Sequence, residues 1–290
     1  MIRHLCIIGV GLIGGSFARA TKGQGICDRI TGVGRNLENL EKAVELGVID
    51  DFDFDIKRAA KEADFVFIST PVGSYQSIFS ELKAVWSSDA VYTDAGSTKQ
   101  SVVESLAEVF GEVPSNFIPG HPIAGAENSG VLASRVDLFR EKQVILTPLE
   151  KSNEWALEKV QKVWQKVEAE VSIMTPAHHD RVLAETSHLP HLLAYALVDL
   201  LGQKNEQREV LKYAAGGFRD FTRIASSDPR MWADICEAND QEIIPLLDQF
   251  SSELMKVSEM LKAQKQGDLL TLFKRAKQTR QQFLDQSDNQ

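Results

Sequence analysis

Short hydrophobic runs alternate with amphipathic stretches over the first 175 or so residues of the chain. Runs that are apolar throughout are typical of strands buried on both faces of a sheet. They predict strands at Leu5–Ile8, Ile30–Gly34, Phe65–Ser69, Ala90–Thr93, Phe117–Pro119, Val144–Thr147 and Val171–Met174. The stretches between them have a helical period and predict helices at Gly14–Lys22, Leu37–Leu46, Ile56–Glu62, Ser74–Val85, Thr98–Phe110 and Glu154–Val167. This alternation indicates an α/β fold with a Rossmann-like, doubly wound and mostly parallel sheet.

The pattern changes at Pro176, after which strand signals disappear and helical periodicity continues almost to the end. Helical runs are predicted at His178–Leu201, Leu211–Ala215, Met231–Phe250, Ser252–Leu261 and Asp268–Leu284. Gly216-Gly217 and the segment 226–229 are predicted to be loops between them. We therefore expect an α/β domain over residues 1–175 and an all-helical second domain over residues 176–290.

Composition limits the classes of partner. The chain has 290 residues, a net charge of −9 and 43% hydrophobic residues, so it has enough apolar material for a core and lacks the basic excess of nucleic-acid-binding proteins. Cys6, Cys27 and Cys236 have no motif spacing, which fits a reducing compartment. We find no secretory signal and no apolar run of membrane-spanning length, so we expect a cytoplasmic protein with neither a nucleic-acid nor a membrane partner.

The strongest motif is a glycine run that follows the first predicted strand. Gly9, Gly11 and Gly14 make a G-x-G-x-x-G pattern, with Leu12 and Ile13 between the last two glycines, directly before a predicted helix. The first glycine permits a tight turn, the second lets the backbone approach a pyrophosphate, and the third lets the helix pack closely on the strand. Free N–H groups at the helix start then bind the anion. The alternative is an ordinary glycine-rich turn, which the strand and helix on either side make the weaker interpretation.

The end of the second strand bears on the choice of nucleotide. NAD-binding proteins usually place an acidic residue there to bind the ribose 2′-hydroxyl, but this chain has Gly34 followed by Arg35. A guanidinium can bind a 2′-phosphate with two hydrogen bonds, which favours NADP. The alternative is that Arg35 is a solvated surface charge and that Asn36 contacts the ribose, which leaves NAD open.

Two further loops follow strands at the same edge of the predicted sheet. One contains Thr70 and Pro71, and the other runs from Asp94 to Lys99 and contains Ser97. Both are expected beside the nicotinamide half of a bound cofactor, where Ser97 would hydrogen-bond the substrate or the cofactor. Each loop taken alone is also compatible with an ordinary connection.

The histidines are unevenly distributed. His121 follows a predicted strand and would therefore face the cofactor, where a neutral imidazole can take the proton of a hydroxyl while hydride leaves the same carbon. Others gather in His178-His179-Asp180 and in Ser187-His188-Leu189-Pro190-His191. We considered a metal site there, but no convincing set of ligands completes it, so we expect no metal and favour a polar helix end that faces the substrate.

A pair of arginines follows the Gly216-Gly217 turn. Arg219 and Arg223 are four residues apart and suit the recognition of a carboxylate substrate. Their spacing alone is also compatible with exposed charges at the start of a helix.

Taken together, these segments resemble the prephenate/arogenate (cyclohexadienyl) dehydrogenase family of tyrosine biosynthesis. The matching motifs occur in family order over nearly the whole chain: 9–16, 94–99, 120–125, 187–191, 216–223 and 227–232. The combination is much more specific than any one motif.

The resemblance implies an oxidative decarboxylation in which hydride leaves the hydroxyl-bearing carbon of a cyclohexadiene ring, CO2 leaves the opposite carbon, and the ring becomes aromatic. It implies that His121 accepts the proton of the ring hydroxyl. It also implies that Ser97 and His191 position the substrate and that Arg223 pairs with a substrate carboxylate. His179 matches a family position to which we assign no firm role.

By the same resemblance, Glu127, Ser187 and Arg219 line the substrate pocket, while Gly216 and Trp232 approach from the partner subunit of a homodimer. The products would be 4-hydroxyphenylpyruvate from prephenate or tyrosine from arogenate. The residues leave the choice between these substrates open, because Glu127 could pair with the ammonium group of arogenate or with Arg219.

The chain departs from some family members in three respects. The Gly34-Arg35 pair resembles relatives that use NADP, whereas many members carry an acid there and use NAD. We also expect neither a chorismate mutase domain nor a regulatory domain, so any feedback by tyrosine would act at the active site. Two other hypotheses stay open, another β-hydroxyacid or imine-type dehydrogenase and a non-catalytic NADP-sensing protein, and turnover of prephenate or arogenate would separate them from the main one.

Overall fold

The computed structural model describes residues 1–126, 128–204, 209 and 212–287 of the chain. These residues form two compact units, Met1–Glu242 and Ile243–Gln290, which we describe separately. The predicted boundary near residue 175 falls inside the first of them.

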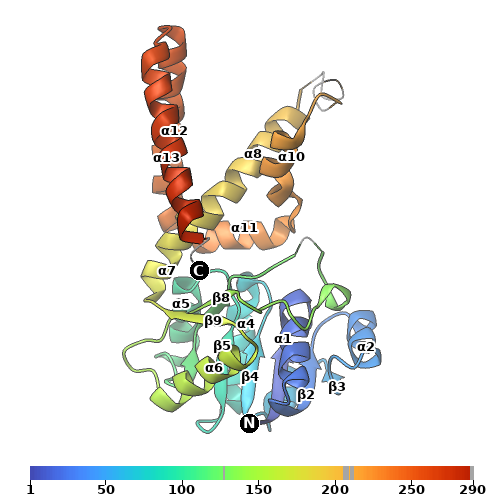
Figure 1. Cartoon of the computed structure of the whole chain (residues 1–290). Helices are drawn as coiled ribbons and strands as arrows, with labels where there is room; N and C mark the ends of the chain where they lie inside the picture. Colours follow the sequence, from blue (N-terminus) through green and yellow to red (C-terminus); the bar gives the residue numbers. More distant parts are fainter. Residues whose placement is uncertain (127, 205–208, 210–211, 288–290) are drawn as a thin grey trace. The chain divides into compact units, whose positions relative to one another are not determined.

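A parallel sheet forms the centre of the first unit (Figure 1). Six of the described strands follow the order β3-β2-β1-β4-β5-β6, and every neighbouring pair is parallel. This is the doubly wound order, with the first strand central and the chain winding outward on both sides, so the predicted Rossmann-like sheet is confirmed. The strands are β1 (Ile2–Ile8), β2 (Cys27–Val33), β3 (Asp51–Asp53), β4 (Phe65–Ile68), β5 (Val91–Asp94) and β6 (Phe117–Ile118).

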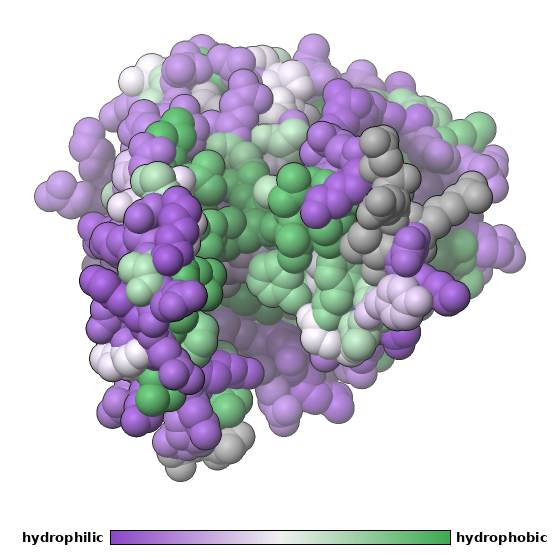
Figure 2. Space-filling view, turned by 90° about the horizontal axis from the view of Figure 1, so that it is seen from above, coloured by the Kyte–Doolittle hydropathy of each residue, from purple (hydrophilic) through white to green (hydrophobic). Residues whose placement is uncertain are grey.

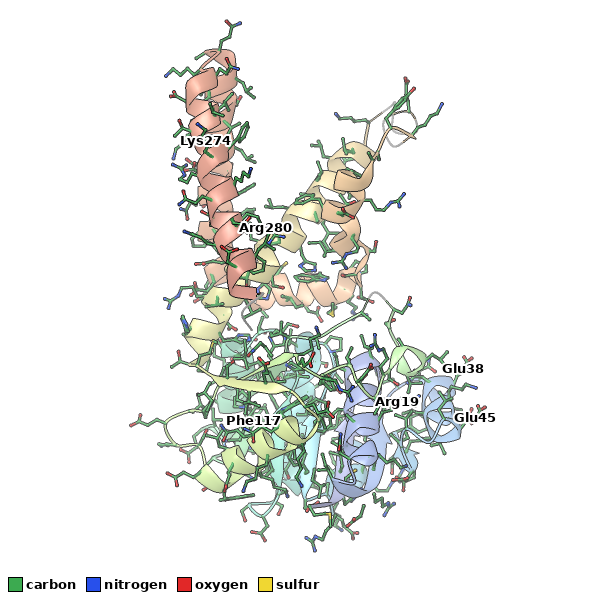
Figure 3. All side chains as sticks on the ribbon, viewed as in Figure 1. Arg19, Glu38, Glu45, Phe117, Lys274 and Arg280 are labelled. Atoms are coloured by element: carbon green, nitrogen blue, oxygen red, sulfur yellow. The ribbon has the colours of Figure 1, made fainter. Side chains whose placement is uncertain are left out.

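Helices cover both faces of this sheet because its apolar strands present side chains alternately to each face. Phe67 of β4 stacks on Phe17 at 4.2 Å between ring centroids, and Trp164 packs beside them on the same face. The opposite face buries Phe117, which is labelled in Figure 3, against Phe79. The helices are α1 (Leu12–Gly23), α2 (Leu37–Glu45), α3 (Ile56–Ala60), α4 (Tyr75–Leu82), α5 (Gln100–Phe110) and α6 (Glu154–Lys166), and the short helices are η1 (Val72–Ser74), η2 (Lys83–Val85) and η3 (Val131–Ala133).

A second, smaller sheet corrects part of the prediction. The run predicted as one strand, Phe117–Pro119, pairs with β5 only as far as Ile118, because Pro119 has no N–H to continue the ladder. The chain then starts β7 (Gly120–Pro122), which pairs antiparallel with β8 (Gln143–Leu146), itself parallel to β9 (Glu170–Ile173). The last two predicted strands therefore form, but in this separate sheet. The strand β3 was not predicted, because its sequence Asp-Phe-Asp shows no apolar run.

The rest of the first unit is helical. The predicted run His178–Leu201 consists of α7 (Pro176–Leu183), a π-helix η4 (Ala184–His188) and α8 (Leu189–Gly202). It is followed by α10 (Gly216–Thr222), the 3-10 helix η5 (Arg223–Ser226) and α11 (Pro229–Ala238). Gly216 and Gly217 open α10 and are not a loop, so that prediction is wrong. Of the predicted helix Leu211–Ala215, Leu211 lies outside the described part of the chain, and residues 213–215 are not helical.

The predicted run Met231–Phe250 is interrupted at Asn239, which lies between α11 and α12 (Asp240–Lys262). The side chain of Asn239 is buried and hydrogen-bonds to α7, which explains why a polar residue breaks the helix here. The predicted break at residue 251 is absent, since α12 runs through it.

The second unit contains most of α12 and all of α13 (Gln266–Ser287). Lys274 and Arg280, labelled on α13 in Figure 3, are exposed. So are large apolar residues of both helices, such as Leu254, Met255 and Phe273. Figure 2 shows hydrophobic residues exposed on the face seen from above. None of the helices in the described ranges combines the length and the apolar character that a membrane span requires.

Candidate active site

The glycine run forms the turn between β1 and α1 that its spacing predicts. Gly9 has φ +100°, a conformation that favours glycine, and a Cβ there would lie 2.7 Å from the carbonyl oxygen of Ser69. A Cβ on Gly14 would lie 2.2 Å from the carbonyl oxygen of Gly9, so only glycine lets α1 begin so close to the strand. A Cβ on Gly11 would meet no atom within 4 Å, so the backbone there is open to a ligand.

A cleft of about 930 Å³ lies beside this turn, at the carboxyl ends of β1, β2 and β4. Predicted cofactor residues that line it are Gly9, Gly11, Arg35, Asn36, Thr70 and Pro71, while Leu12, Ile13 and Gly14 do not line it. Leu12, Ile13 and Gly14 form the first turn of α1, whose N–H groups have no intrahelical acceptor, and the cap residue Gly11 supplies no side-chain bond. This is the arrangement that binds a pyrophosphate, so the cleft fits a dinucleotide.

The lining of the cleft includes the residues predicted to select the nucleotide. Arg35 is exposed directly beyond the end of β2. The side chain of Asn36 caps α2 by accepting a hydrogen bond of 3.0 Å from the N–H of Asn39. Asn36 is therefore engaged in its own helix, and Arg35 is the side chain of this pair that is the better placed to meet a ligand. Phe54 and Ile56 add apolar surface to the lining.

The loop after β5 is held by a buried ion pair. The side chains of Lys99 and Asp94 are both fully buried, and the Lys99 Nζ donates to Asp94 Oδ2 at 2.5 Å and to the carbonyl oxygen of Gly120 at 2.6 Å. Asp94 Oδ1 accepts the N–H of Gly120 at 2.9 Å. These bonds attach the loop to the strand that carries His121. Ser97 lies half-buried in the same loop, and its hydroxyl makes no hydrogen bond to any residue that the structure describes.

His121 lies in β7 and hydrogen-bonds to a second histidine. Its Nδ1 is 2.9 Å from Nε2 of His179 on α7, whose Nδ1 is 2.7 Å from Oδ1 of Asp180. The His121 side chain is partly exposed, and its Nε2 has no hydrogen-bond partner within the described part of the chain. Burial, with the charges of His179 and Lys99 adding to it, holds the pKa of His121 well below its ordinary value. His121 is therefore a neutral imidazole at neutral pH. Its Nδ1 is hydrogen-bonded to His179, and its Nε2 is accessible.

His191 lies in the first turn of α8 and is stacked on Trp232 of α11, with ring centroids 3.7 Å apart. Its Nδ1 is 2.8 Å from the carbonyl oxygen of Ser187, so Nδ1 carries the proton and Nε2 accepts. Burial lowers the pKa of His191, and the nearby charge of Arg223 lowers it further. The hydrogen bond to the carbonyl oxygen of Ser187 acts in the opposite direction and raises this pKa. The structure thus brings His191, Trp232 and Arg223 into one neighbourhood.

A buried layer connects His191 to His121. His188 is 1% exposed, and its ring lies 6.1 Å from that of Trp232. A charge on His188 would lower the pKa of His121, and a charge on His191 lowers the pKa of His188. Asn239 holds this layer together, since its Nδ2 donates to Nδ1 of His188 at 3.0 Å and to the carbonyl oxygen of Asp180 at 2.9 Å.

Other predicted site residues lie on α10 and η5. Arg219 and Arg223 line one cleft of about 600 Å³. Gly216, at the start of α10, is exposed and does not line that cleft. Glu127 lies outside the described residues. Over the described ranges 1–126, 128–204, 209 and 212–287, no group of His, Cys, Asp or Glu side chains is arranged to hold a metal ion.

Sequence reasoning missed three residues that organise the site, Asp180, Lys99 and Asn239. Asp180 directly follows a histidine, and an acidic neighbour of a histidine on a helix is a signal that could have found it. Asn239 carries no comparable signal, because its partners are far away in the sequence, and the bond of Lys99 to Gly120 is equally hidden although its other partner, Asp94, lies in the same loop.

Comparison with known proteins gives a family for this architecture. The model of the prephenate dehydrogenase nucleotide-binding domain matches residues 17–173, and the model of the prephenate dehydrogenase dimerization domain matches residues 175–275.

The chain is 36% identical to the cyclohexadienyl dehydrogenase of Zymomonas mobilis, over 97% of this chain and 96% of that protein. It is 38% identical to the prephenate dehydrogenase of Bacillus subtilis, over 95% of this chain and 75% of that protein. The structure of prephenate dehydrogenase from Aquifex aeolicus in complex with hydroxyphenyl propionate and NAD+ superposes with a TM-score of 0.90 at 38% identity, covering 98% of this chain and 99% of that one.

Proposed function

The chain belongs to the prephenate dehydrogenase family, and we propose from this premise that its site oxidises and decarboxylates prephenate, arogenate or both. It is an NAD(P)-dependent dehydrogenase, and the reaction needs three things from the protein: a dinucleotide cleft, a base at the reacting hydroxyl, and cations for the substrate carboxylates. The observation that carries the proposal is the neutral His121, which has an accessible Nε2 and is held by hydrogen bonds in β7. Its neighbour Gly120 is bonded to Asp94 at the end of β5, one strand of the parallel sheet whose carboxyl ends form the dinucleotide cleft.

The chemistry balances within the substrate, the cofactor and one base. A nicotinamide bound in the cleft would supply the acceptor for the hydride of the hydroxyl-bearing carbon. His121 Nε2 takes the hydroxyl proton as the carbonyl forms. The carboxylate on the opposite ring carbon then leaves as CO2, its bonding electrons make the ring aromatic, and the phenolic oxygen recovers a proton from His121. Because aromatisation drives the second step, the protein has only to orient the ring and hold one proton.

The substrate carboxylates are proposed to meet Arg223 and Arg219. Both line one cleft, and a guanidinium binds a carboxylate with two parallel hydrogen bonds. His191, packed on Trp232, presents an Nε2 that accepts a hydrogen bond. An accepting nitrogen suits a hydroxyl or ammonium group of the substrate, which can donate a hydrogen bond, better than a carboxylate, which only accepts.

Four other residues are proposed at the site on the strength of the family motifs. Ser97, whose loop is attached to the strand of His121, would position the ring hydroxyl. Ser187 fixes His191 through its carbonyl oxygen, while Glu127 would line the pocket and Gly216 would approach from the partner subunit.

The cofactor is proposed to be NADP in preference to NAD. Gly34 stands where a carboxylate would bind a ribose 2′-hydroxyl, and Arg35 is exposed beside it in the lining of the cleft. Two carboxylates, Glu38 and Glu81, also line the cleft, but they come from helices α2 and α4. Neither stands at the end of β2, where a carboxylate would bind the ribose 2′-hydroxyl of NAD.

The assembly is proposed to be a homodimer formed through the helical domain. The matched family model is that of a dimerization domain, and α12 and α13 expose large apolar side chains. We keep residues 1–175 as the proposed dinucleotide-binding domain and residues 176–290 as the proposed helical domain.

The test is turnover of the purified chain with prephenate and arogenate, each with NAD+ and NADP+, followed by the absorbance of the reduced nicotinamide and by release of CO2. Reduction of a nicotinamide with one CO2 released per turnover is expected for at least one of the four combinations. Cofactor binding with no turnover of either substrate would instead support a protein that senses the nucleotide.

A further inference from the structure

We propose that His179 and Asp180 of α7 set the tautomer of His121 and share the positive charge that it acquires, so that the base is complete only when α7 is packed on β7 and on the start of α5. This inference rests on the proposed function and assigns positioning roles to two residues that do not touch the reacting atoms.

The direction of the hydrogen bonds follows from the chemistry of the three side chains. An ionised aspartate only accepts hydrogen bonds, so Nδ1 of His179 must donate to Asp180 Oδ1 across their 2.7 Å contact. Burial lowers the pKa of His179 and thereby favours its neutral form, which has no second proton. Nε2 of His179 must then accept, and Nδ1 of His121 donates to it at 2.9 Å. The remaining nitrogen of His121, Nε2, is left with the free electron pair that a base needs.

The hydrogen bonds from His121 through His179 to Asp180 form a relay, and the carboxylate of Asp180, which ends it, is itself fixed. Asp180 is 2% exposed, and its two oxygens accept the backbone N–H groups of Lys99 and Gln100, each at 2.8 Å. Gln100 is the first residue of α5, so the carboxylate also lies at the positive end of a helix dipole. Asn239 also donates a hydrogen bond of 2.9 Å to the backbone carbonyl oxygen of Asp180. Asp180 can therefore neither rotate nor leave its position without breaking buried bonds.

The charges around His121 explain why the relay is needed. Burial disfavours its protonated form, and the groups that face it from other elements are cationic when charged: His179 from α7, Lys99 from the loop after β5, and His188 from the π-helix. The charge of Lys99 is matched by Asp94. The carboxylate that reaches His121 by hydrogen bonds is Asp180, through His179, and it offsets the cost of forming a buried imidazolium during the reaction.

The test compares His179→Leu with His179→Gln, using His178→Leu and His178→Gln as matched controls. His178 is the exposed neighbour on α7 and bonds to Arg181 outside the site. Leucine removes the acceptor for His121 Nδ1, whereas the amide oxygen of glutamine can keep it. We expect His179→Leu to lower kcat about 10²-fold, the scale of lost general-base catalysis, with KM changed less than about twofold, and His179→Gln to recover part of that loss.

The second readout is the ¹⁵N spectrum of the His121 imidazole, which reports its tautomer whether or not the enzyme turns over. We expect protonation at Nδ1 in the parent and in His179→Gln, and a mixture of tautomers in His179→Leu. An unchanged tautomer in His179→Leu would overturn the proposal, and so would a changed tautomer with unchanged kcat. If the parent turned over neither substrate, the proposed function would fail, and the ¹⁵N result alone would then support or overturn the relay.

Discussion

The imidazole of His191 stacks on the indole of Trp232, with 3.7 Å between ring centroids and 19° between ring planes. His191 comes from the start of α8 and Trp232 from α11, so the contact fixes one helix against the other inside a single chain. The resemblance implies that Trp232 approaches from a partner subunit, and within one chain it also holds His191. Its effect on a substrate is therefore expected to pass through the orientation of His191.

Replacement of Trp232 by alanine is expected to destabilise the fold. The side chain is 8% exposed, and removal of a buried tryptophan typically lowers the free energy of unfolding by about 3–5 kcal/mol. Trp232→Phe keeps a ring under His191 and should cost much less. Denaturant unfolding of both variants measures the difference, and equal destabilisation by the two would show that the stack contributes little.

His121→Asn is expected to lower kcat by about 10²-fold or more while the substrate still binds. Asparagine keeps a polar side chain beside His179 but has no basic nitrogen to take a proton. Steady-state kinetics gives kcat, and titration under non-turnover conditions gives the substrate Kd. Normal turnover by this variant would remove His121 from the role of base.

Arg223→Ala is expected to weaken substrate binding far more than cofactor binding. The guanidinium acts electrostatically on His191 and lines the cleft with Arg219, away from the residues that line the dinucleotide cleft. Arg230, exposed on α11, supplies a matched control in Arg230→Ala. Separate titrations with substrate and with cofactor decide the matter, since equal weakening of both would contradict a carboxylate role.

The parts of the site that depend on local sequence could be predicted, and the parts that depend on packing could not. Gly9 and Gly14 are where a turn and a close helix start require glycine, and neighbouring residues suffice to show that requirement. Asp180 acts on Lys99, 81 residues away, and only the packing of α7 on α5 brings them together. The second sheet could not be predicted for the same reason. Pro119 indicates where the ladder with β5 ends, but it does not indicate that the following residues pair with β8.

Arg35→Ala is expected to raise the Kd for NADP+ more than the Kd for NAD+. The side chain is exposed at the end of β2 in the lining of the cleft, and only NADP+ carries a 2′-phosphate for it to bind. Fluorescence titration of parent and variant with both nucleotides measures the ratio. If the ratio of the two Kd values did not change, the preference for NADP would have to be abandoned.

Buried histidines make the stability of the fold depend on acid. Burial, reinforced by the charges of His179 and His191, lowers the pKa of His188 from the ordinary 6.5 to about 4. Between these values the unfolded chain binds a proton that the folded chain excludes. The stabilisation is therefore fully present above pH 6.5 and is lost as the pH falls toward 4. By linkage His188 alone accounts for about 3 kcal/mol of this loss, and His121, His179 and His191, whose pKa values are also lowered, act in the same direction.

His188→Asn tests this acid dependence. The asparagine oxygen can still accept the bond from Asn239, but the side chain takes no proton, so the decline in unfolding free energy between pH 6.5 and 4 should be shallower than in the parent. His178→Asn, at an exposed position on the same helical run, should leave the decline unchanged. Urea unfolding at several pH values and one fixed protein concentration measures both, because subunit association would otherwise shift the apparent stability. Identical pH dependence in His188→Asn and the parent would mean that His188 is protonated in the folded chain as readily as in the unfolded one, contrary to its burial beside Trp232.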